Sequence, residues 1–510
     1  MKLNRSVGRR LGLVVGGVAA AALLLLALEY TLRGLDIGAE RGLFTAERGA
    51  DGRSMLRLFW NPQFNKPVPP GPQRDFLADK PPGTFRIFVI GESSAEGTPY
   101  GSGRAFSWWL AQRLQAQLPE VHFEVVNAAL AGSQSGSMLV MVRDIAKHAP
   151  DLLVVYLGHN EVGGHLTAAE RAALDPERFD LRALLARSRL YRVLARALPA
   201  PAKRLDARQA QPPAAVPPVG SPDNYASDAD RAVIERVYRA RIAEMVRIMR
   251  GAGARTALLT LSQNFSDWPP VVSVHSRQLD AAATTAWAAA VQEGDDLAAR
   301  DCRTAMAAWQ RAAALDDGFA ALHFRMAGCE RNLGELDRAR ADFRLASELD
   351  RFSQGAPLAF NDILREVAEH DGALLVDVDA ALIRASGDHL VGDDLSVDAM
   401  HPNLRGHQLI AAAVADAMRL AGIPLPADRW RTDAYVDQDP AAILAADPEI
   451  RVNELVSRAV VCFAAGRNAC AFEQLAVAKS ATRNDTTRQA IERFFQAAPA
   501  AAGPKQQAGS

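Results

Sequence analysis

The chain has 510 residues, enough for two or more domains, and its hydrophobic fraction of 49% is that of a globular protein. The formal net charge is −1 and no long cluster of Lys and Arg occurs, so a nucleic-acid partner is not expected. Aromatic residues make up only 6% of the chain, and alanine dominates many of the stretches that favour helix.

The N-terminus combines a basic flank with an apolar stretch. Four Lys and Arg residues lie within the first ten positions, and residues 11–28 follow as 18 residues without a charge. At ~1.5 Å per helical residue, this stretch just spans a hydrocarbon core ~30 Å thick. A cleaved signal peptide and a buried helix are the alternatives, but no clear cleavage site or lipobox cysteine follows. We expect a transmembrane signal anchor over 11–32, with residues 1–10 in the cytoplasm and the rest facing the periplasm of a bacterial inner membrane.

Residues 33–82 lack hydrophobic periodicity and contain proline-rich runs, so we expect a linker that is partly stiffened by proline. From residue 83 on, strand-like apolar runs alternate with helical stretches. The expected strands are 85–90, 121–127, 152–157, 256–262 and 373–378, and the clearest helices are 106–118, 136–148 and 231–250. This alternation predicts an α/β fold with a parallel sheet that is covered on both faces. Residues 199–222, rich in Pro and Ala, are expected to form a surface loop.

An internal repeat lies between the fourth and fifth expected strands. Five positions recur 34 residues later, which is the period of tetratricopeptide repeats. Ala305, Trp309, Ala312, Leu315 and Asp316 correspond to Ala339, Phe343, Ala346, Leu349 and Asp350. We expect residues 280–352 to form a tetratricopeptide-like α-helical module, inserted into an α/β domain that comprises 83–279 and 353–425. Its concave face could hold a partner protein or guide a polymeric substrate.

The remaining C-terminal residues are expected to form a helical region over 426–496 and a disordered tail over 497–510. Within this region, a third repeat unit and accidental alanine spacing are two alternative interpretations of one pattern, formed by Ala459, Gly466, Ala471, Leu475 and Ala478.

The four cysteines form two close pairs, Cys302/Cys329 and Cys462/Cys470. Two disulfides and four buried thiols are equally compatible with this spacing. No Cys or His spacing is typical of a metal site, and no cofactor is expected.

Three short motifs carry candidate catalytic groups. Gly91-Glu92-Ser93-Ser94-Ala95-Glu96-Gly97 follows one expected strand, Gly158-His159-Asn160-Glu161 follows another, and Asp398-Ala399-Met400-His401 precedes a helical run. A serine hydroxyl needs an adjacent base at neutral pH, and the imidazole of His401 is suited to that role. Asp398, three residues earlier, can reach the imidazole and fix its tautomer. The negative oxygen of a tetrahedral intermediate needs donors, for which the N–H groups of Ser93 and Gly132 and the amide of Asn160 are candidates.

Gly91-Glu92-Ser93, Gly132, Gly158-x-Asn160 and Asp398-x-x-His401 resemble the four blocks of the SGNH (GDSL-type) hydrolase family, in the family's order. The resemblance covers residues 83–165, 230–275 and 357–422. It implies a flavodoxin-like α/β fold and esterase chemistry. The chain departs from the family at Glu92, where Asp is usual, and at Glu161, where Asp is frequent, but both changes keep the charge. Ser94 is a competing nucleophile, although Ser93 holds the third position of its block.

Four further residues are weighed as possible pocket residues. His159 neighbours Asn160, and Asn264, Trp268 and His275 follow the fourth strand on the edge where α/β sheets bind ligands. A purely structural role is the alternative for each of them.

Three functions fit these observations. The first is a membrane-anchored, extracytoplasmic serine esterase or deacylase acting on a glycan, a lipid or a small ester. The second is an O-acyltransferase for a cell-surface polysaccharide, in which a sugar hydroxyl replaces water at the same site. The third is a non-catalytic repeat scaffold, against which the filled catalytic positions argue. The sequence does not separate water from a sugar as the acceptor, because that depends on the dryness and shape of the pocket.

Overall fold

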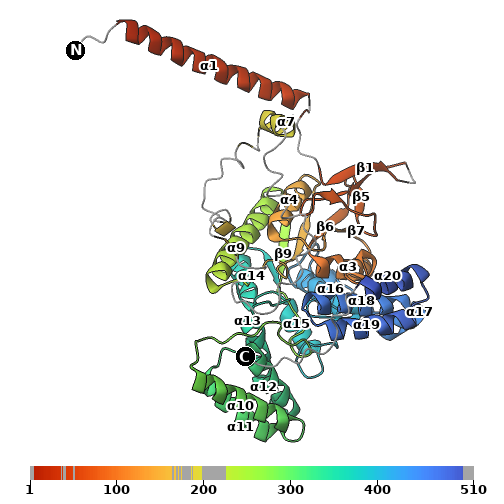
Figure 1. Ribbon diagram of the computed structural model, residues 1–510. Coiled ribbons are helices and arrows are strands. Elements are labelled where there is room, and N and C mark those ends of the chain that lie inside the picture. Colours follow the sequence, from red (N-terminus) through yellow and green to blue (C-terminus); the bar gives the residue numbers. More distant parts are fainter. Residues whose placement is uncertain are drawn as a thin grey trace. The chain divides into compact units, whose positions relative to one another are not determined.

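The computed structural model describes residues 5–35, 37, 42–49, 52–162, 166–167, 170–171, 174, 185, 188–197 and 225–497 (Figure 1). The chain divides into two units, one from 1–42 with 177–214 and the other from 43–176 with 215–510. The expected surface loop at 199–222 lies outside the described residues, as does the expected tail beyond residue 497.

The first unit contains the helices α1 (Arg5–Gly34) and α7 (Arg189–Ala197). Glu29 of α1 caps the start of α7. Its carboxylate accepts hydrogen bonds from Ser188 Oγ at 2.8 Å and from the N–H groups of Arg189 and Leu190 at 3.0 Å each. The expected signal anchor at 11–32 falls within α1. Among the described residues, no helix has both the length and the apolar character needed to cross a membrane.

The second unit is built around a five-stranded sheet with the order β10-β9-β8-β6-β7. All of its pairings are parallel. The strands are β6 (Thr84–Gly91), β7 (His122–Asn127), β8 (Leu152–Tyr156), β9 (Arg255–Leu259) and β10 (Leu374–Val376). Strand β8 is buried along its whole length, as expected for a sheet covered on both faces. All five strands lie where the sequence predicted them, and their order is that of flavodoxin-like folds.

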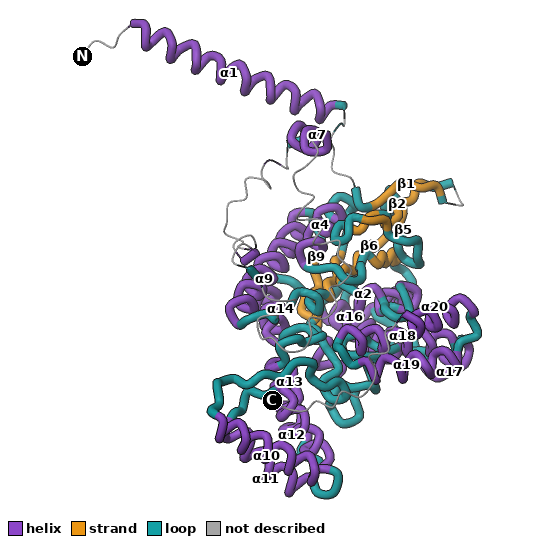
Figure 2. The backbone as a smooth tube through the Cα atoms, viewed as in Figure 1, coloured by secondary structure: helices purple, strands orange, loops and turns teal. Residues whose placement is uncertain are grey.

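Helices cover both faces of this sheet (Figures 1 and 2). Helix α3 (Phe106–Gln117) packs against α16 (Leu404–Leu420), while α9 (Asp228–Gly251) packs against both α4 (Ser135–Ile145) and α14 (Leu358–Asp371). The rings of Tyr238 and Phe360 stack between α9 and α14 with their centroids 4.2 Å apart. The shorter elements are α2 (Ser93–Glu96), η1 (Ser102–Arg104), α15 (Val378–Ala385) and η3 (Ala427–Arg429).

Residues 43–49 and 52–78 contain five β-strands, so the linker expected over 33–82 is wrong for these residues. Strands β1 (Phe44–Arg48), β2 (Ser54–Leu58) and β5 (Asp75–Leu77) form an antiparallel sheet, and β3 (Trp60–Asn61) pairs with β4 (Lys66–Pro67). Phe44, Leu58 and Phe76 belong to the main hydrophobic core. The ring of Phe76 lies edge-on to that of Phe88 in β6, with centroids 5.1 Å apart. These strands are too short to show an alternating pattern in the sequence.

The expected insertion forms four helices, α10 (Ala281–Ala298), α11 (Cys302–Leu315), α12 (Ala320–Asn332) and α13 (Leu336–Leu349). Each packs against the next. Helices α11 and α13 begin and end 34 residues apart, and the corresponding side chains of Trp309 and Phe343 are both buried. A disulfide joins Cys302 to Cys329. Helical hairpins are therefore present, while their assignment to the tetratricopeptide class stays a prediction.

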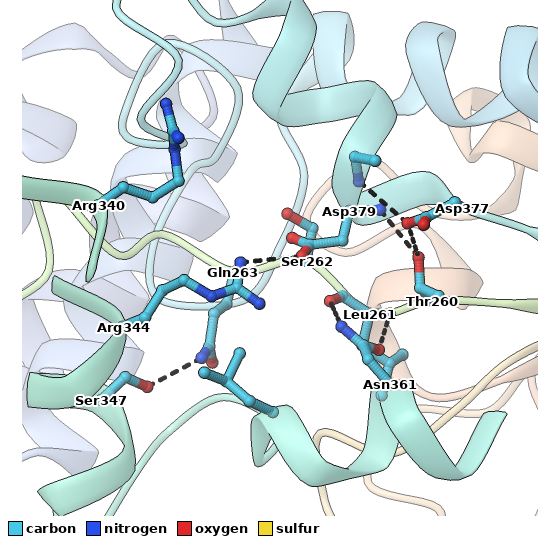
Figure 3. A network of polar contacts seen from close by, with 12 residues as sticks. Thr260, Leu261, Ser262, Gln263, Arg340, Arg344, Ser347, Asn361, Asp377 and Asp379 are labelled. Atoms are coloured by element: carbon cyan, nitrogen blue, oxygen red, sulfur yellow. Dashed lines mark hydrogen bonds and ion pairs between the residues drawn. The ribbon is translucent and has the colours of Figure 1, made fainter. Parts of the chain in front are cut away.

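A polar network joins α13 to the edge of the sheet (Figure 3). Arg344 of α13 forms an ion pair with Asp379 at 3.1 Å, and Gln263 Nε2 donates to Ser347 Oγ at 2.9 Å. The backbone N–H of Asp379 in turn donates to Thr260 Oγ1 at 3.0 Å. Because Thr260 directly follows β9, the insertion is held at the carboxyl end of that strand.

The C-terminal region forms α17 (Pro440–Ala446), α18 (Glu449–Ala464), α19 (Asn468–Ala481) and α20 (Asp485–Ala497). Helices α18 and α19 pair as a hairpin, and a disulfide joins Cys462 to Cys470 across it. Both cysteine pairs thus form disulfides, which decides between the two alternatives that the spacing allowed.

We predict that deleting residues 1–82 prevents stable folding, whereas deleting residues 1–42 does not. Residues 43–82 contribute five buried apolar side chains to the core, Leu43, Phe44, Leu58, Val68 and Phe76. Burying each one is worth ~1.5–3 kcal/mol, and their sum approaches the net stability of ~5–15 kcal/mol of a whole domain. Thermal unfolding followed by circular dichroism measures this. Equal midpoints for the two truncated chains would contradict the prediction.

Candidate active site

The expected nucleophile, Ser93, is the first residue of α2, on the turn that leaves the carboxyl end of β6. The turn depends on Gly91, whose φ is 157°. A Cβ at this position would lie 2.0 Å from the carbonyl oxygen of Tyr156 and 2.6 Å from the Cβ of Ala95. Only glycine lets the turn approach β8 this closely. Ser93 is thereby placed at the sheet edge where α/β folds bind ligands.

Ser93, His401 and Asp398 form one hydrogen-bonded chain. His401 Nε2 lies 2.8 Å from Ser93 Oγ, and His401 Nδ1 lies 2.8 Å from Asp398 Oδ2. Asp398 is fully buried, and its Oδ1 accepts the backbone N–H groups of Met400 and His401 at 3.1 Å each. The carboxylate therefore orients the imidazole, which keeps Nε2 free to accept the serine proton.

Three ionisable side chains near His401 have shifted pKa values. Burial would raise the pKa of Asp398, but His401 and the surrounding N–H groups lower it below its ordinary value. Two other imidazoles lie near His401. Burial, and then the charge of His401, lower the pKa values of His159 and His407 to about 3. Both rings are neutral at pH 7, and neither competes for the proton.

Ser94, the competing nucleophile, is turned away from the imidazole. Its side chain is buried, and its hydroxyl donates to the carbonyl oxygen of Met400 at 3.0 Å. This contact helps to hold the loop that carries His401. The Ser94 hydroxyl thus bonds to the backbone, whereas the Ser93 hydroxyl bonds to the His401 imidazole.

The two other expected oxyanion donors, Gly132 and Asn160, lie on loops that are tied to the nucleophile turn. The N–H of Leu130 donates to the carbonyl oxygen of Gly91 at 3.1 Å. Asn160 Nδ2 donates to the carbonyl oxygen of Ser133 at 3.3 Å, which joins the loop of Asn160 to the loop of Gly132. The structure thus brings together the three blocks that the sequence offered as donors.

Phe64 borders this region, although the sequence placed it in a linker. Gly132 has a φ of 73°, and a Cβ there would lie 2.7 Å from Cζ of Phe64. Phe64 is 48% exposed, and Lys66 Nζ lies 5.1 Å from the centroid of its ring. An exposed aromatic ring therefore stands directly beside a candidate oxyanion donor.

Glu92 joins the nucleophile turn to the Asn160 loop. Its Oε1 accepts the N–H groups of Gly158 at 2.9 Å and Asn160 at 3.2 Å, and its Oε2 accepts that of His159 at 2.9 Å. Burial and then the charge of Glu161 raise the pKa of Glu92 to about 8, and the three N–H groups oppose this rise. The Glu92 side chain thus bridges the turn that carries Ser93 and the loop that carries Asn160.

Glu161 makes a second bridge, from the Asn160 loop to the start of α4. Its carboxylate accepts the backbone N–H of Ser135 and, at 2.8 Å, the hydroxyl of the same residue. Burial raises the pKa of Glu161, while the Ser135 bonds and the nearby Arg241 lower it. Both acidic departures from the family pattern therefore serve to position loops.

His159 is buried, and its Nδ1 accepts the N–H of Ala356 at 3.2 Å. The three candidate pocket residues after β9 all have side-chain partners outside the triad. These contacts are Asn264 Nδ2 to Asp393 Oδ1 at 2.8 Å, Trp268 Nε1 to Gln354 Oε1 at 2.8 Å, and His275 Nδ1 to Asp316 Oδ2 at 2.6 Å. His275 also packs against the rings of Trp287 and Phe319 in the insertion. The contacts give Asn264, Trp268 and His275 structural partners, and their role in a pocket stays a prediction.

Part of the chain is similar to known proteins. Residues 89–331 match the sequence model of the GDSL-like Lipase/Acylhydrolase family, so the match ends before Asp398. An α/β hydrolase enzyme, LAE5, from the metagenome of Lake Arreo in Spain is 17% identical, with a TM-score of 0.30, over 65% of this chain and 94% of its own. The acetylxylan esterase Axe2 from Geobacillus stearothermophilus is 13% identical, with a TM-score of 0.30, over 66% of this chain and 94% of its own. No curated protein sequence matches the chain.

We predict that Glu92→Gln lowers the free energy of unfolding by ~1–3 kcal/mol, because the new amide N–H₂ would face one of three buried N–H donors and leave it without an acceptor. Chemical denaturation at pH 9 measures the change, because this pH lies above the Glu92 pKa of about 8 and the wild-type carboxylate is ionised there. Glu293→Gln is the matched control. Glu293 forms an exposed ion pair with Arg311, and its loss should cost less than ~1 kcal/mol. Equal losses for the two variants would contradict the bridging role of Glu92.

Proposed function

We propose that this ester-bond hydrolase of the GDSL-like lipase/acylhydrolase family is a membrane-anchored, extracytoplasmic deacylase with Ser93 as its nucleophile. The observation that carries the catalytic part is the unbroken chain from Ser93 Oγ through His401 to Asp398, with both links 2.8 Å long. Such a chain is what a serine nucleophile needs at neutral pH.

In the first half of the reaction, Ser93 Oγ attacks the carbonyl carbon of the ester while its proton passes to His401 Nε2. The charge on the resulting imidazolium is balanced by Asp398, which stays ionised. The N–H groups of Ser93 and Gly132 and the amide of Asn160 would stabilise the negative oxygen of the tetrahedral intermediate. Collapse of this intermediate breaks the ester bond, and His401 returns the proton to the departing alcohol. An acyl-serine remains.

In the second half, water attacks the acyl-serine and gives its proton to His401, and Ser93 leaves with that proton as the acid is released. A sugar hydroxyl in place of water would make the same site an O-acyltransferase. The covalent intermediate is shared by both reactions, so the acceptor separates them.

We predict that the full-length chain, extracted in detergent, hydrolyses p-nitrophenyl esters and that Ser93→Ala loses at least about a thousandfold in kcat. Ser94→Ala should remain active, because its hydroxyl contacts the Met400 carbonyl rather than His401. Esters of acetyl, butyryl and octanoyl groups should be compared, each with and without oligosaccharide acceptors. Acyl transfer that exceeds hydrolysis would favour the transferase, and activity that survives in Ser93→Ala would exclude the proposed nucleophile.

The proposed location rests on the sequence at the N-terminus and on the cysteines. The basic flank and the uncharged stretch at 11–28 are typical of a signal anchor. Two disulfides, Cys302–Cys329 and Cys462–Cys470, suit an oxidising compartment outside the cytoplasm.

We predict that alkaline phosphatase, which needs an oxidising compartment, is active when fused to the C-terminus, and that a cytoplasmic reporter fused there is not. Full-length protein should require detergent for extraction, and a chain that lacks residues 1–35 should not. A mature N-terminus near residue 30, found by N-terminal sequencing, would replace the anchor with a cleaved signal peptide.

A further inference from the structure

Helix α18 of the C-terminal hairpin contacts the loop that carries Asp398 and His401. Ser457 Oγ lies 3.2 Å from Asp398 Oδ2. The next residue, Arg458, donates to the carbonyl oxygen of Val397 at 3.1 Å and pairs with Asp393 at 2.8 Å. Two successive residues of one helix therefore hold the dipeptide 397–398 at the start of the catalytic loop.

The contact of Ser457 completes the hydrogen bonding of a buried charge. Asp398 is fully buried, so its carboxylate depends on donors from the protein. Oδ1 accepts two backbone N–H groups of the loop itself, and Oδ2 accepts His401 Nδ1 and the Ser457 hydroxyl. An ionised carboxylate can only accept, so the serine must be the donor. Among the described residues, Ser457 and His401 are the two side chains bonded to Asp398.

Apolar packing fixes α18 in this place. Ala399, which lies between the two catalytic residues, shares a hydrophobic cluster with Val452, Leu455 and Ala459 of α18. Arg458 also lies over the ring of Trp268, 5.5 Å from its centroid. The disulfide between Cys462 and Cys470 joins α18 to α19. The hydroxyl of Ser457 is therefore presented by a rigid element rather than by a mobile tail.

We propose that Ser457 is a positioning residue of the active site, which acts through Asp398, and that α18 completes a site whose other residues all come from the α/β domain. This inference rests on the proposed esterase function. Ser457 holds Asp398 in the orientation that keeps the His401 proton on Nδ1. Because it acts through Asp398 and not through the substrate, its loss changes kcat and leaves KM nearly unchanged.

The first test compares Ser457→Ala with the wild-type full-length chain on a p-nitrophenyl ester. A hydrogen bond to a charged group is worth ~1.5–3 kcal/mol, so kcat should fall about tenfold or more while KM stays within about twofold. Ser457→Thr keeps the hydroxyl and should retain most of the activity. Val has nearly the shape of Thr but no hydroxyl, so Ser457→Val should behave like Ser457→Ala. Ser480→Ala in α19 is a control, because the exposed Ser480 hydroxyl donates to the Val477 carbonyl of its own helix.

The second test asks whether Ser457 acts through Asp398. The rate of labelling by a fluorophosphonate probe is measured for Ser457→Ala, Asp398→Asn and the double variant. The Ser457→Ala change should slow labelling about tenfold in the wild-type background and by less than about twofold in the Asp398→Asn background. Thermal unfolding of each variant reports any loss of folded protein.

Three results would overturn the inference. These are an unchanged kcat in Ser457→Ala, equal activities of the Thr and Val variants, and the same loss in both backgrounds of the second test. In each of these cases a wild-type chain that cleaves esters in a Ser93-dependent manner leaves the proposed function standing. If the wild type shows no Ser93-dependent cleavage or labelling, the proposed function fails and this inference fails with it.

Discussion

The hydrogen bond between His401 Nε2 and Ser93 Oγ joins two residues that lie 308 positions apart in the sequence. The rest of the second unit has to hold these two atoms within hydrogen-bonding distance of each other. Ser93 is set by the end of β6 and by the close approach that Gly91 permits, and His401 is set by a tight loop before α16. A displacement of about 1 Å in either would cost much of the catalytic advantage. The contacts between loops therefore matter as much as the side chains of Ser93, His401 and Asp398 themselves.

Acidic side chains at the carboxyl edge of the sheet hold these loops together. Glu92 bridges the nucleophile turn and the Asn160 loop, and Glu161 bridges that loop and α4. In the described part of the chain both carboxylates bond to loop N–H and hydroxyl groups rather than to the triad, and they hold the loop that carries Asn160, a candidate oxyanion donor. The four-helix insertion, α10 to α13, contacts the sheet at the same edge. There Arg344 forms an ion pair with Asp379, and Gln263 donates to Ser347. A large insertion therefore lies at the same edge of the sheet as a site in which Ser93 and His401 must keep a fixed distance.

The sequence was sufficient for the parts of the molecule that rest on local patterns. Buried strands such as β8 read as continuous apolar runs, and the spacing from Asp398 to His401 gave their contact directly. The strands β1 to β5 were not predicted, because strands of two to five residues show too little hydrophobic periodicity. Their place in the core depends on distant partners such as Phe88. Ser457 escaped prediction for a related reason, since it lies within an ordinary amphipathic helix, 59 residues beyond the carboxylate that it bonds.

The most direct test of the account is to map the labelled residue after a fluorophosphonate probe has reacted with the intact protein. Mass spectrometry of the digested protein identifies the serine that carries the phosphonyl group. The account predicts that the group lies on Ser93 and that His401→Ala abolishes its attachment. A label on Ser94, or labelling of Ser93 that persists at the same rate in His401→Ala, would contradict the catalytic site described here.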